Sequence, residues 1–398
     1  MLLYLIIFII PVLAYMIGPQ ENRNKHFLQI YMLALTLFVG FADMMGGYDR
    51  YIYGEVFDRI ADGVTMGDEI VTLREFQHFE IGYSTLSYLI ALVTENRYIY
   101  IFIVTMLIYF FMYKAFEHSM NNYPMAMIIF LGMVFFFTFT YLRQVLAFSI
   151  AWFGIRYFVE KKWFKFLLVC AIVTLLHKAG IVFLGILLVP IRKWNPMTII
   201  FILLICAAIG LSGVTGHLYD TFSEISEIQM RNNYDTDNGM RIAYMFEVAF
   251  FAWIILTSYN KIAPTRKNLI FLNMAWSFCA ILLLFMKSSD GGRVAWFFTL
   301  GIIYIITLIC TNSQINSNLR ASQIMVKNQQ MLSFLMVILM MGLYLRVYIA
   351  WQQYNNLYPY KTFLTDGYRS PDFSRESHEY DYSYDLDKFY RPAFRFLK

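Results

Sequence analysis

Two short segments place an acid beside aromatic side chains, an arrangement suited to a hydroxyl-rich substrate. Asp49 and Tyr53 are four residues apart and therefore share a face if the segment is helical. Glu80 precedes Tyr83 at the start of a short apolar stretch, where a carboxyl group is suited to general acid or base chemistry. The alternatives are an aromatic belt at the membrane interface for the first segment and a favourable charge at a helix N-terminus for Glu80.

Two further segments place an arginine at the edge of apolar sequence. Arg143, followed by Gln144, lies between two apolar stretches, and Arg293 ends the segment KSSDGGR, whose glycines let backbone amides approach an oxyanion. A guanidinium keeps its charge at any relevant pH and binds phosphate through two parallel hydrogen bonds. These arginines therefore predict anion binding, and the alternative is an arginine that anchors a helix at the membrane interface.

His177 and Lys178 lie where two short apolar stretches meet. Histidine titrates near neutral pH and can take a proton from an acceptor hydroxyl. The lysine beside it disfavours a protonated imidazole, which favours a base. The alternative is a structural histidine at a turn.

The motifs of several enzyme classes are absent from the sequence. No GxSxG, HExxH, DxD or nucleotide-binding fingerprint occurs where it could act, and segment 287–293 is not a Walker loop. The 4 cysteines lie in apolar runs without CxxC spacing, so they predict packing and not a metal site. The net charge of +5 is spread along the chain, which disfavours nucleic-acid binding. We expect no cofactor and no metal.

The elements that position these residues are apolar helices. The chain is 59% hydrophobic and 15% charged, against about 25% charged residues in soluble domains. A transmembrane helix needs roughly 17 to 25 mostly apolar residues. The sequence predicts an all-α polytopic membrane protein with about twelve such helices. They are expected at 1–17, 27–42, 98–115, 124–142, 144–160, 163–177, 179–192, 196–213, 241–259, 268–286, 294–310 and 331–351.

Segment 82–95 is short and rich in hydroxyls, which predicts a re-entrant or interfacial helix. If it does not cross the membrane, the lysines and arginines of the short loops fall on one side, which is then the cytoplasm. Both termini are then extracytoplasmic. The same applies to the loops 43–97, 214–240 and 287–293 of a transmembrane domain at 1–351, and to the polar tail at 352–398. Residues 163–192 form either a tight hairpin or one broken helix.

Arginines also remain on the predicted outer side, against the usual bias. They are Arg50, Arg59, Arg74, Arg97, Arg143, Arg231, Arg241 and Arg293. Such a set suggests anion binding, and the alternative is pairing with the carboxylates of the outer loops. The tail at 352–398 predicts either a flexible extramembrane segment or an aromatic, acidic surface that helps to hold sugars.

The order of these segments resembles the EpsG family of exopolysaccharide polymerases, relatives of the Wzy O-antigen polymerases. The family pattern is G-x-D-Y-x-x-Y, then E-P-G-F, an R-Q pair, a histidine, and a late arginine followed by aromatics. The corresponding residues here, within 1 to about 310, are Gly47, Asp49 and Tyr53; Glu80, Gly82 and Tyr83; Arg143 and Gln144; His177; and Arg293 with Trp296, Phe297 and Phe298. This chain departs from the pattern in having Ile81 for the proline, Arg50 after instead of before the aspartate, and Lys-Ala-Gly after the histidine.

The resemblance implies a metal-independent, GT-C-like membrane glycosyltransferase at the outer face of the bacterial inner membrane. Its substrate would be an oligosaccharide repeat unit linked to undecaprenyl pyrophosphate. A chain-length regulator and a flippase of the same pathway would be its partners. The implied roles are pyrophosphate binding by Arg143, Gln144, Arg293, Lys178, Arg241 and Arg50, deprotonation of the acceptor by His177, Glu80 or Asp49, and sugar contacts by Tyr53 and Tyr83. The alternatives are a ligase that uses the same donor, a transporter or flippase, and a structural scaffold.

Overall fold

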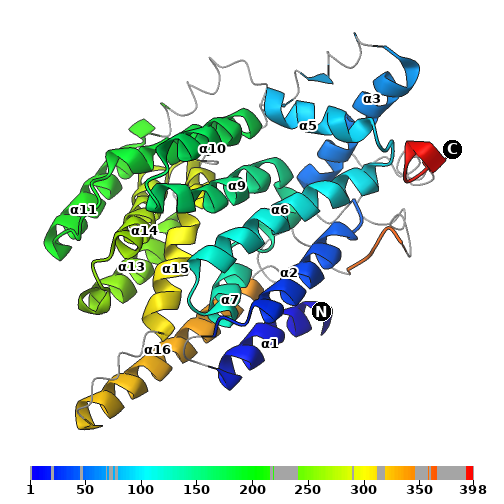
Figure 1. Ribbon diagram of the computed structural model, residues 1–398. Coiled ribbons are helices and arrows are strands. Elements are labelled where there is room, and N and C mark those ends of the chain that lie inside the picture. The colour runs from blue at the N-terminus through cyan, green and yellow to red at the C-terminus, as the bar shows by residue number, and fades with distance from the viewer. Residues whose placement is uncertain are drawn as a thin grey trace.

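The fold is helical throughout the part of the chain that the computed structural model describes (Figure 1). That part comprises residues 2–18, 22–44, 48–68, 70, 75–76, 79–215, 218, 241–288, 291–311, 319–345, 357, 360–364 and 391–397. Within these residues the single β-type pairing is the bridge between Ala42 and Thr362. The predicted all-α class is confirmed. Most of loop 214–240 and most of the tail lie outside the described residues.

Each of the predicted apolar segments contains a helix. In chain order the helices are α1 (Leu2–Ile17), α2 (Lys25–Gly40), α3 (Tyr48–Met66), α5 (Ile81–Ala91), α6 (Arg97–Ser119), α7 (Tyr123–Met133), α8 (Phe137–Thr140), α9 (Leu142–Val159), α10 (Trp163–Leu176), the 3-10 helix η1 (Lys178–Leu188), α11 (Pro196–Ser212), α13 (Ile242–Thr257), η2 (Tyr259–Lys261), α14 (Arg266–Leu284), η3 (Gly291–Phe298), α15 (Thr299–Thr311), α16 (Leu319–Leu345) and η6 (Arg395–Leu397).

Among the described residues, 3 helices are long and apolar enough to cross a membrane: Arg97–Ser119, Arg266–Leu284 and Gly292–Thr311. Further apolar helices, among them α1, α10 and α11, have only 10–17 residues. The helical segments of the prediction are therefore in place, and the number of about twelve crossings stays a prediction. The GT-C-like architecture is likewise an expectation from the family resemblance.

Short polar residues begin several of these helices. A side-chain oxygen accepts a backbone N–H of the first turn at Asn24 of α2, Asn96 of α6, Asn122 of α7, Asn195 of α11 and Thr265 of α14. Such caps satisfy amides that the helix itself leaves without a partner. The sequence therefore determines where these helices start.

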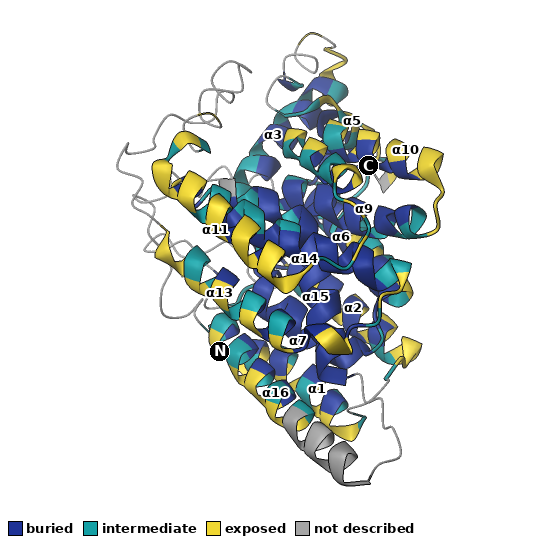
Figure 2. Cartoon of the chain, turned by 90° about the vertical axis from the view of Figure 1, so that its left-hand side faces the viewer, coloured by how far each residue is buried: buried dark blue, intermediate teal, exposed yellow. Residues whose placement is uncertain are grey.

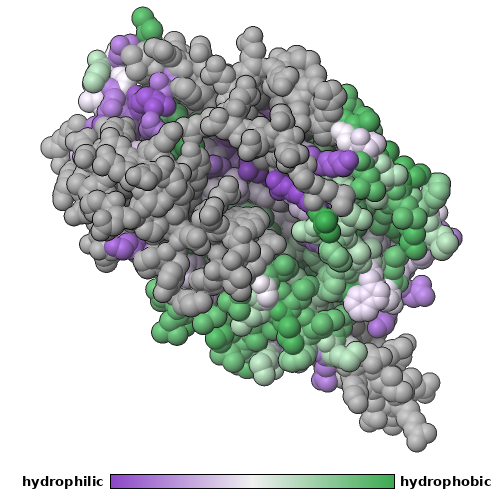
Figure 3. All heavy atoms as spheres, turned by 180° about the vertical axis from the view of Figure 1, so that it is seen from behind, coloured by the Kyte–Doolittle hydropathy of each residue, from purple (hydrophilic) through white to green (hydrophobic). Residues whose placement is uncertain are grey.

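Central and peripheral helices differ in what they expose. Helices α7 and α15 are buried along almost their whole length, whereas α1, α11, α13 and α16 present apolar side chains outward (Figure 2). Phe201, Phe246 and Phe334 are each about two-thirds or more exposed. Hydrophobic side chains cover the lower and right-hand parts of the view from behind, and hydrophilic ones gather above them (Figure 3). A surface of this kind suits a lipid environment, as expected for a membrane protein.

Basic loops gather at one end of the bundle. Glu117 accepts from Lys25 at 3.2 Å and from Lys114 at 3.1 Å, which joins the loop before α2 to the end of α6. Lys267, at the start of α14, donates to the carbonyl oxygen of Ser119 at 2.7 Å. Three of the basic segments predicted to share one side therefore meet. We call this end the basic end.

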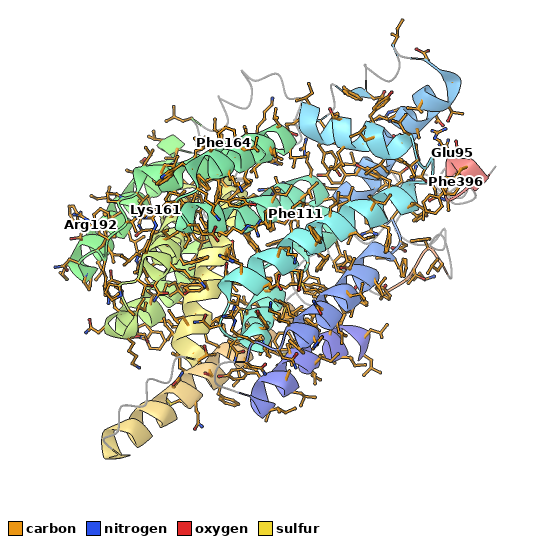
Figure 4. The ribbon with its side chains drawn as sticks, in the orientation of Figure 1. Glu95, Phe111, Lys161, Phe164, Arg192 and Phe396 are labelled. Atoms are coloured by element: carbon orange, nitrogen blue, oxygen red, sulfur yellow. The ribbon has the colours of Figure 1, made fainter. Side chains whose placement is uncertain are left out.

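Parts of the C-terminal tail lie at the opposite end. Figure 4 places Lys161 and Arg192 on the left of the bundle, and Glu95 with Phe396 on the right. The guanidinium of Arg395 donates to the carbonyl oxygens of Ala91 at 2.6 Å and Ala61 at 2.9 Å. Residues 360–364 pack beside the end of α2, where the Phe363 N–H donates to the Phe41 carbonyl at 3.2 Å. These described parts of the tail are held against the bundle.

Helix α5 lies at the end away from the basic loops and does not cross the bundle. Helix α5 starts after Glu80, and Glu80 contacts Arg143 at the start of α9. The chain after α5 leads to Arg97 at the start of α6. The other ends of α6 and α9 lie at the basic end, where Arg266 donates to the carbonyl of Val159 at 3.0 Å. Both ends of the α5 segment therefore lie at the same end of the bundle, and the re-entrant or interfacial position in a membrane stays a prediction.

Residues 163–192 form a hairpin. Helix α10 ends at Leu176, and η1 turns back along it from His177. The rings of Phe166 and Phe183, on the two arms, have centroids 5.7 Å apart. Gly180 makes the close turn possible, since a Cβ there would lie 2.6 Å from a methyl carbon of Val173. His177 and Lys178 lie at this turn, at the same end of the bundle as Glu80 and Arg143.

Candidate functional site

One carboxylate joins three helix starts at the end away from the basic loops. Glu80 lies just before α5, and its Oε2 accepts from Nη1 of Arg143, at the start of α9, at 2.6 Å. Its Oε1 accepts the backbone N–H of Lys178, at the start of η1, at 3.1 Å. The side chains of Glu80 and Arg143 are only 9% and 16% exposed, so the ion pair is largely removed from water. We call these two side chains the Glu80–Arg143 pair.

Part of the Arg143 guanidinium makes no hydrogen bond to the described residues. Its Nε is buried and makes no hydrogen bond within the described part of the chain. The ring of Phe79 lies 5.0 Å from the guanidinium carbon and supports the group from one face. The Nε and Nη2 edge of an arginine is one of its two-donor forks, and it matches the spacing of phosphate oxygens. A buried donor without a partner calls for an explanation, and a ligand oxygen supplies one.

Arg293 also lies near the Glu80–Arg143 pair, because residues at the start of α9 contact it. Gln144 Nε2 donates to the carbonyl oxygen of Arg293 at 2.9 Å, which ties η3 to the start of α9. The Arg293 guanidinium carbon lies 4.4 Å from the ring centroid of Tyr141, whose hydroxyl accepts from Nη2 at 3.4 Å. Trp296 packs against the same tyrosine, with ring centroids 5.3 Å apart. Residues 150 positions apart in sequence are thus neighbours here.

His177 lies between α10 and η1, outside both helices. Its Nδ1 accepts the backbone N–H of Ala179 at 3.2 Å, so the imidazole caps η1. Burial, followed by the positive charges of Arg143 and Arg293, holds the pKa of His177 well below its ordinary value. The imidazole is therefore neutral at physiological pH, close to both arginines.

The two predicted sugar-contacting tyrosines form an aromatic cluster with Phe79. The ring centroids of Tyr53 and Tyr83 are 5.7 Å apart, and each lies within 5.5 Å of that of Phe79. Both tyrosines are buried, and the Tyr83 hydroxyl accepts from that of Tyr100 at 3.0 Å. They form the wall behind the Glu80–Arg143 pair.

Asp49 belongs to the same neighbourhood from the first turn of α3. Burial raises the pKa of Tyr53, the charge of Arg143 opposes this shift, and the charges of Asp49 and Glu80 add to it. Asp49 also acts on the charge of Arg143 itself. The structure therefore brings together Asp49, Tyr53, Glu80, Tyr83, Arg143, Gln144, His177 and Arg293.

The remaining predicted anion-binding residues are placed differently. Arg50 is fully buried and donates to three carbonyl oxygens of residues 39–42, at 2.9–3.2 Å, so it caps the end of α2. Lys178 offers its backbone N–H to the site while its side chain is exposed. Arg241 is exposed and donates to the Tyr244 hydroxyl at 3.1 Å. The Tyr244 hydroxyl lies against Gly292, the residue before Arg293. Arg241 therefore approaches Arg293 only through Tyr244.

Two other arginines of the predicted outer set pair with carboxylates, which is the alternative to anion binding. Arg97 and Asp58 form an ion pair in which both side chains are fully buried. Arg59 pairs with Glu75 at 2.8 Å. These ion pairs stabilise the predicted outer segment and leave the Arg143 and Arg293 region as the candidate anion site.

The sequence indicated no role for Phe79, which lies beside Glu80, and did not indicate Tyr100 as a member of the site. Neither carries a charge or a motif, and each acts through a contact made by the fold. Among the described residues, no group of three or more His, Cys, Asp or Glu side chains is arranged to hold a metal ion. Metal independence stays an expectation.

Comparison with known families gives one match. The model of the EpsG family matches residues 25–362, which is most of the chain and includes every segment of the site. Comparisons with curated proteins and with solved structures gave no match.

Proposed function

The chain belongs to the EpsG family, the exopolysaccharide polymerase family, and from this we propose that it polymerises lipid-linked oligosaccharide repeat units. The donor is a growing glycan on undecaprenyl pyrophosphate, and the acceptor is the non-reducing sugar of the next lipid-linked unit. The product is an exopolysaccharide, a capsule or an O-antigen. The protein is then a membrane glycosyltransferase.

The observation that carries this proposal is the buried Nε of Arg143, which donates to none of the described residues, with Arg293 nearby. Glycosyl transfer from a pyrophosphate donor builds negative charge on the leaving oxygen as the anomeric bond breaks. Fixed donors aimed at that charge lower the barrier, and removing one typically costs about 10²- to 10³-fold in rate. Two guanidiniums are held in place before the substrate arrives, one by Glu80 and Phe79 and the other by Tyr141.

The reaction also needs a base for the acceptor hydroxyl. Glu80, His177 and Asp49 are the three groups of the site that are chemically able to accept a proton. Tyr53 and Tyr83 are buried against Phe79, so they support the site from behind and do not present a surface to the sugars. No step requires energy beyond that of the donor, because the lipid pyrophosphate is itself a good leaving group.

The sidedness of the site supports a reaction outside the cytoplasm. The basic loops gather at one end, and by the positive-inside rule that end faces the cytoplasm. The Glu80–Arg143 pair and the described parts of the C-terminal tail lie at the other end. We place this end, with both termini, at the outer face of a bacterial inner membrane, where the lipid-linked units arrive from a flippase.

The test uses a strain that lacks this protein and makes no long-chain surface glycan. Arg143→Lys and Arg293→Lys keep the charge but remove the fork, so each should abolish or strongly shorten the polymer while single repeat units accumulate on the lipid. Arg192→Lys is the matched control, because Arg192 stacks on Trp194 at the basic end. Unchanged chain lengths in both site variants, at equal membrane abundance, would refute the assignment.

The same gel separates the two rival functions. A ligase that uses the same donor adds one block per acceptor and gives no ladder of repeat units. If the protein is instead a transporter or flippase, its loss leaves the lipid-linked unit on the cytoplasmic leaflet, so single units would be missing from the outer face as well.

A further inference from the structure

We propose that Glu80 occupies the place of the substrate's phosphate until the substrate arrives, and then becomes the base of the reaction. The incoming pyrophosphate displaces the carboxylate from Arg143, and the released carboxylate takes the proton of the acceptor hydroxyl. His177 donates a hydrogen bond and does not take that proton. This inference rests on the proposed function and adds an order of events to it.

The contacts of Glu80 are those that a phosphate group would make. One oxygen accepts from a guanidinium at 2.6 Å, and the other accepts a backbone N–H at the start of a helix at 3.1 Å. Both kinds of donor recur wherever proteins bind phosphate. The carboxylate is therefore an internal anion in a site built for anions, and it is only 9% exposed.

Arg143 has the capacity to exchange one anion for another. Glu80 uses only Nη1, and the buried Nε has no partner in the described part of the chain. A phosphate oxygen that reaches this edge would therefore meet a donor that the carboxylate does not use. Once both anions touch one guanidinium they repel each other, and the more highly charged pyrophosphate keeps the arginine.

His177 is not arranged to act as the base. Its Nδ1 already accepts the Ala179 N–H at 3.2 Å, so the proton of the neutral imidazole lies on Nε2. In that tautomer Nε2 donates and has no lone pair for a proton. Uptake of a second proton is opposed by burial and by the charges of Arg143 and Arg293, which hold the pKa of His177 well below its ordinary value.

The resulting step is balanced. The acceptor oxygen attacks the anomeric carbon of the donor while its proton passes to a carboxylate oxygen of Glu80. The bond between the anomeric carbon and the pyrophosphate oxygen breaks, and its electron pair goes to that oxygen, next to Arg143 and Arg293. When the lipid pyrophosphate leaves, Glu80 gives its proton to water and its carboxylate returns to Arg143.

The exchange is tested by binding alone. The probe is farnesyl pyrophosphate, and its affinity for the full-length protein in detergent is measured by thermophoresis. Glu80→Gln keeps the shape but removes the competing charge, so this variant should bind the probe about tenfold more tightly than wild type. Arg143→Lys should bind it more weakly. Equal or weaker binding by Glu80→Gln, at an unchanged melting temperature, overturns the exchange.

The base is tested by turnover with a lipid-linked repeat unit. Glu80→Gln should lose about 10²- to 10⁴-fold in rate, and Glu80→Asp should recover part of it because it restores the carboxylate. His177→Gln keeps a donor near the position of Nε2 but cannot act as a base, so it should stay within about tenfold of wild type. An inactive His177→Gln beside an active Glu80→Gln would make His177 the base and overturn the inference.

The two proposals fail in different ways. If wild-type protein neither binds farnesyl pyrophosphate nor forms polymer, the proposed function itself is refuted. If it does both and Glu80→Gln behaves as wild type in each assay, the function stands and the role given to Glu80 is refuted.

Discussion

Gly82 controls how closely α5 approaches α10, and replacing it with alanine should move the site without touching it. A Cβ at this position would lie 2.7 Å from the carbonyl oxygen of Leu175 and 2.8 Å from its carbonyl carbon. Ordinary contacts begin at 3.4 Å, so the two backbones must separate by about 0.7 Å. Because the obstacle is backbone, no side-chain rotation relieves it.

This displacement should move the Glu80 carboxylate, because Gly82 lies only two residues after Glu80. Moving the start of α5 away from α10 pulls Glu80 from Arg143 and from the Lys178 N–H. A misplacement of about 1 Å can cost about 10²-fold in rate, so we expect Gly82→Ala to lose about 10- to 100-fold in polymer formation. The accompanying loss of stability should be about 1–3 kcal/mol, as for other overpacked sites.

The assay compares polymer ladders on gels, normalised to the amount of protein in the membrane. Gly185→Ala is the matched control, since it lies on η1 and a Cβ there has nothing within 4 Å. That variant should keep the wild-type ladder. A Gly82→Ala ladder that is indistinguishable from the Gly185→Ala ladder would refute the argument that the spacing of α5 and α10 positions Glu80.

Three further predictions concern stability and the tail. Asp58→Asn removes the negative charge of a fully buried ion pair with Arg97 and should lower the free energy of unfolding by about 3–5 kcal/mol, visible as a lower melting temperature in detergent. Glu55→Gln breaks an ion pair with Arg59 that is over a third exposed, so it should change the free energy of unfolding by at most about 1 kcal/mol. Equal losses in the two variants would contradict the argument from burial. Arg395→Ala removes donors to two backbone carbonyls, so limited proteolysis should release the end of the tail faster; an unchanged rate would show that these bonds do not hold it. The pKa of His177 is lowered in the folded protein, so below the unfolded value of about 6.5 only the unfolded chain takes up this proton. Stability should therefore fall on acidification through that range, and the fall should be shallower in His177→Asn, which keeps an oxygen to cap η1.

Much of the site could be identified from the sequence one residue at a time. Glu80, Arg143, His177 and Arg293 each stood out because a polar group beside apolar sequence is costly without a purpose. What the sequence could not give was their mutual contacts, since Glu80 and Arg143 are 63 positions apart and meet only through the packing of α5 on α10. The role of Phe79 follows from the same packing.

Arg50 illustrates why residue type alone was insufficient. An arginine against the positive-inside bias suggested anion binding, yet the guanidinium is surrounded by the carbonyl oxygens that end α2. Those carbonyls need a donor because a helix leaves its last oxygens without partners. The sequence does not show where α2 ends relative to Arg50, so the capping role became visible only in the structure.

The apolar sequence predicted the positions of the helices but not the breaks within them. The apolar run 124–142 is divided between α7 and α8, with the break at residues 134–136, and the run that begins at 294 starts as the 3-10 helix η3 before it becomes α15. Hydrophobicity is continuous across both interruptions, so composition gave no sign of them. Both lie beside the site: Phe137 of α8 stacks on Trp296 of η3 with ring centroids 4.1 Å apart.

The most direct test is reconstitution of the purified protein in lipid vesicles with a repeat unit on undecaprenyl pyrophosphate. We expect a ladder of polymer, with one undecaprenyl pyrophosphate released for each glycosidic bond formed. Arg143→Lys combined with Arg293→Lys should abolish both signals while the protein stays folded. Failure of the wild-type protein to form polymer under these conditions, or equal polymer from the double variant, would contradict the account.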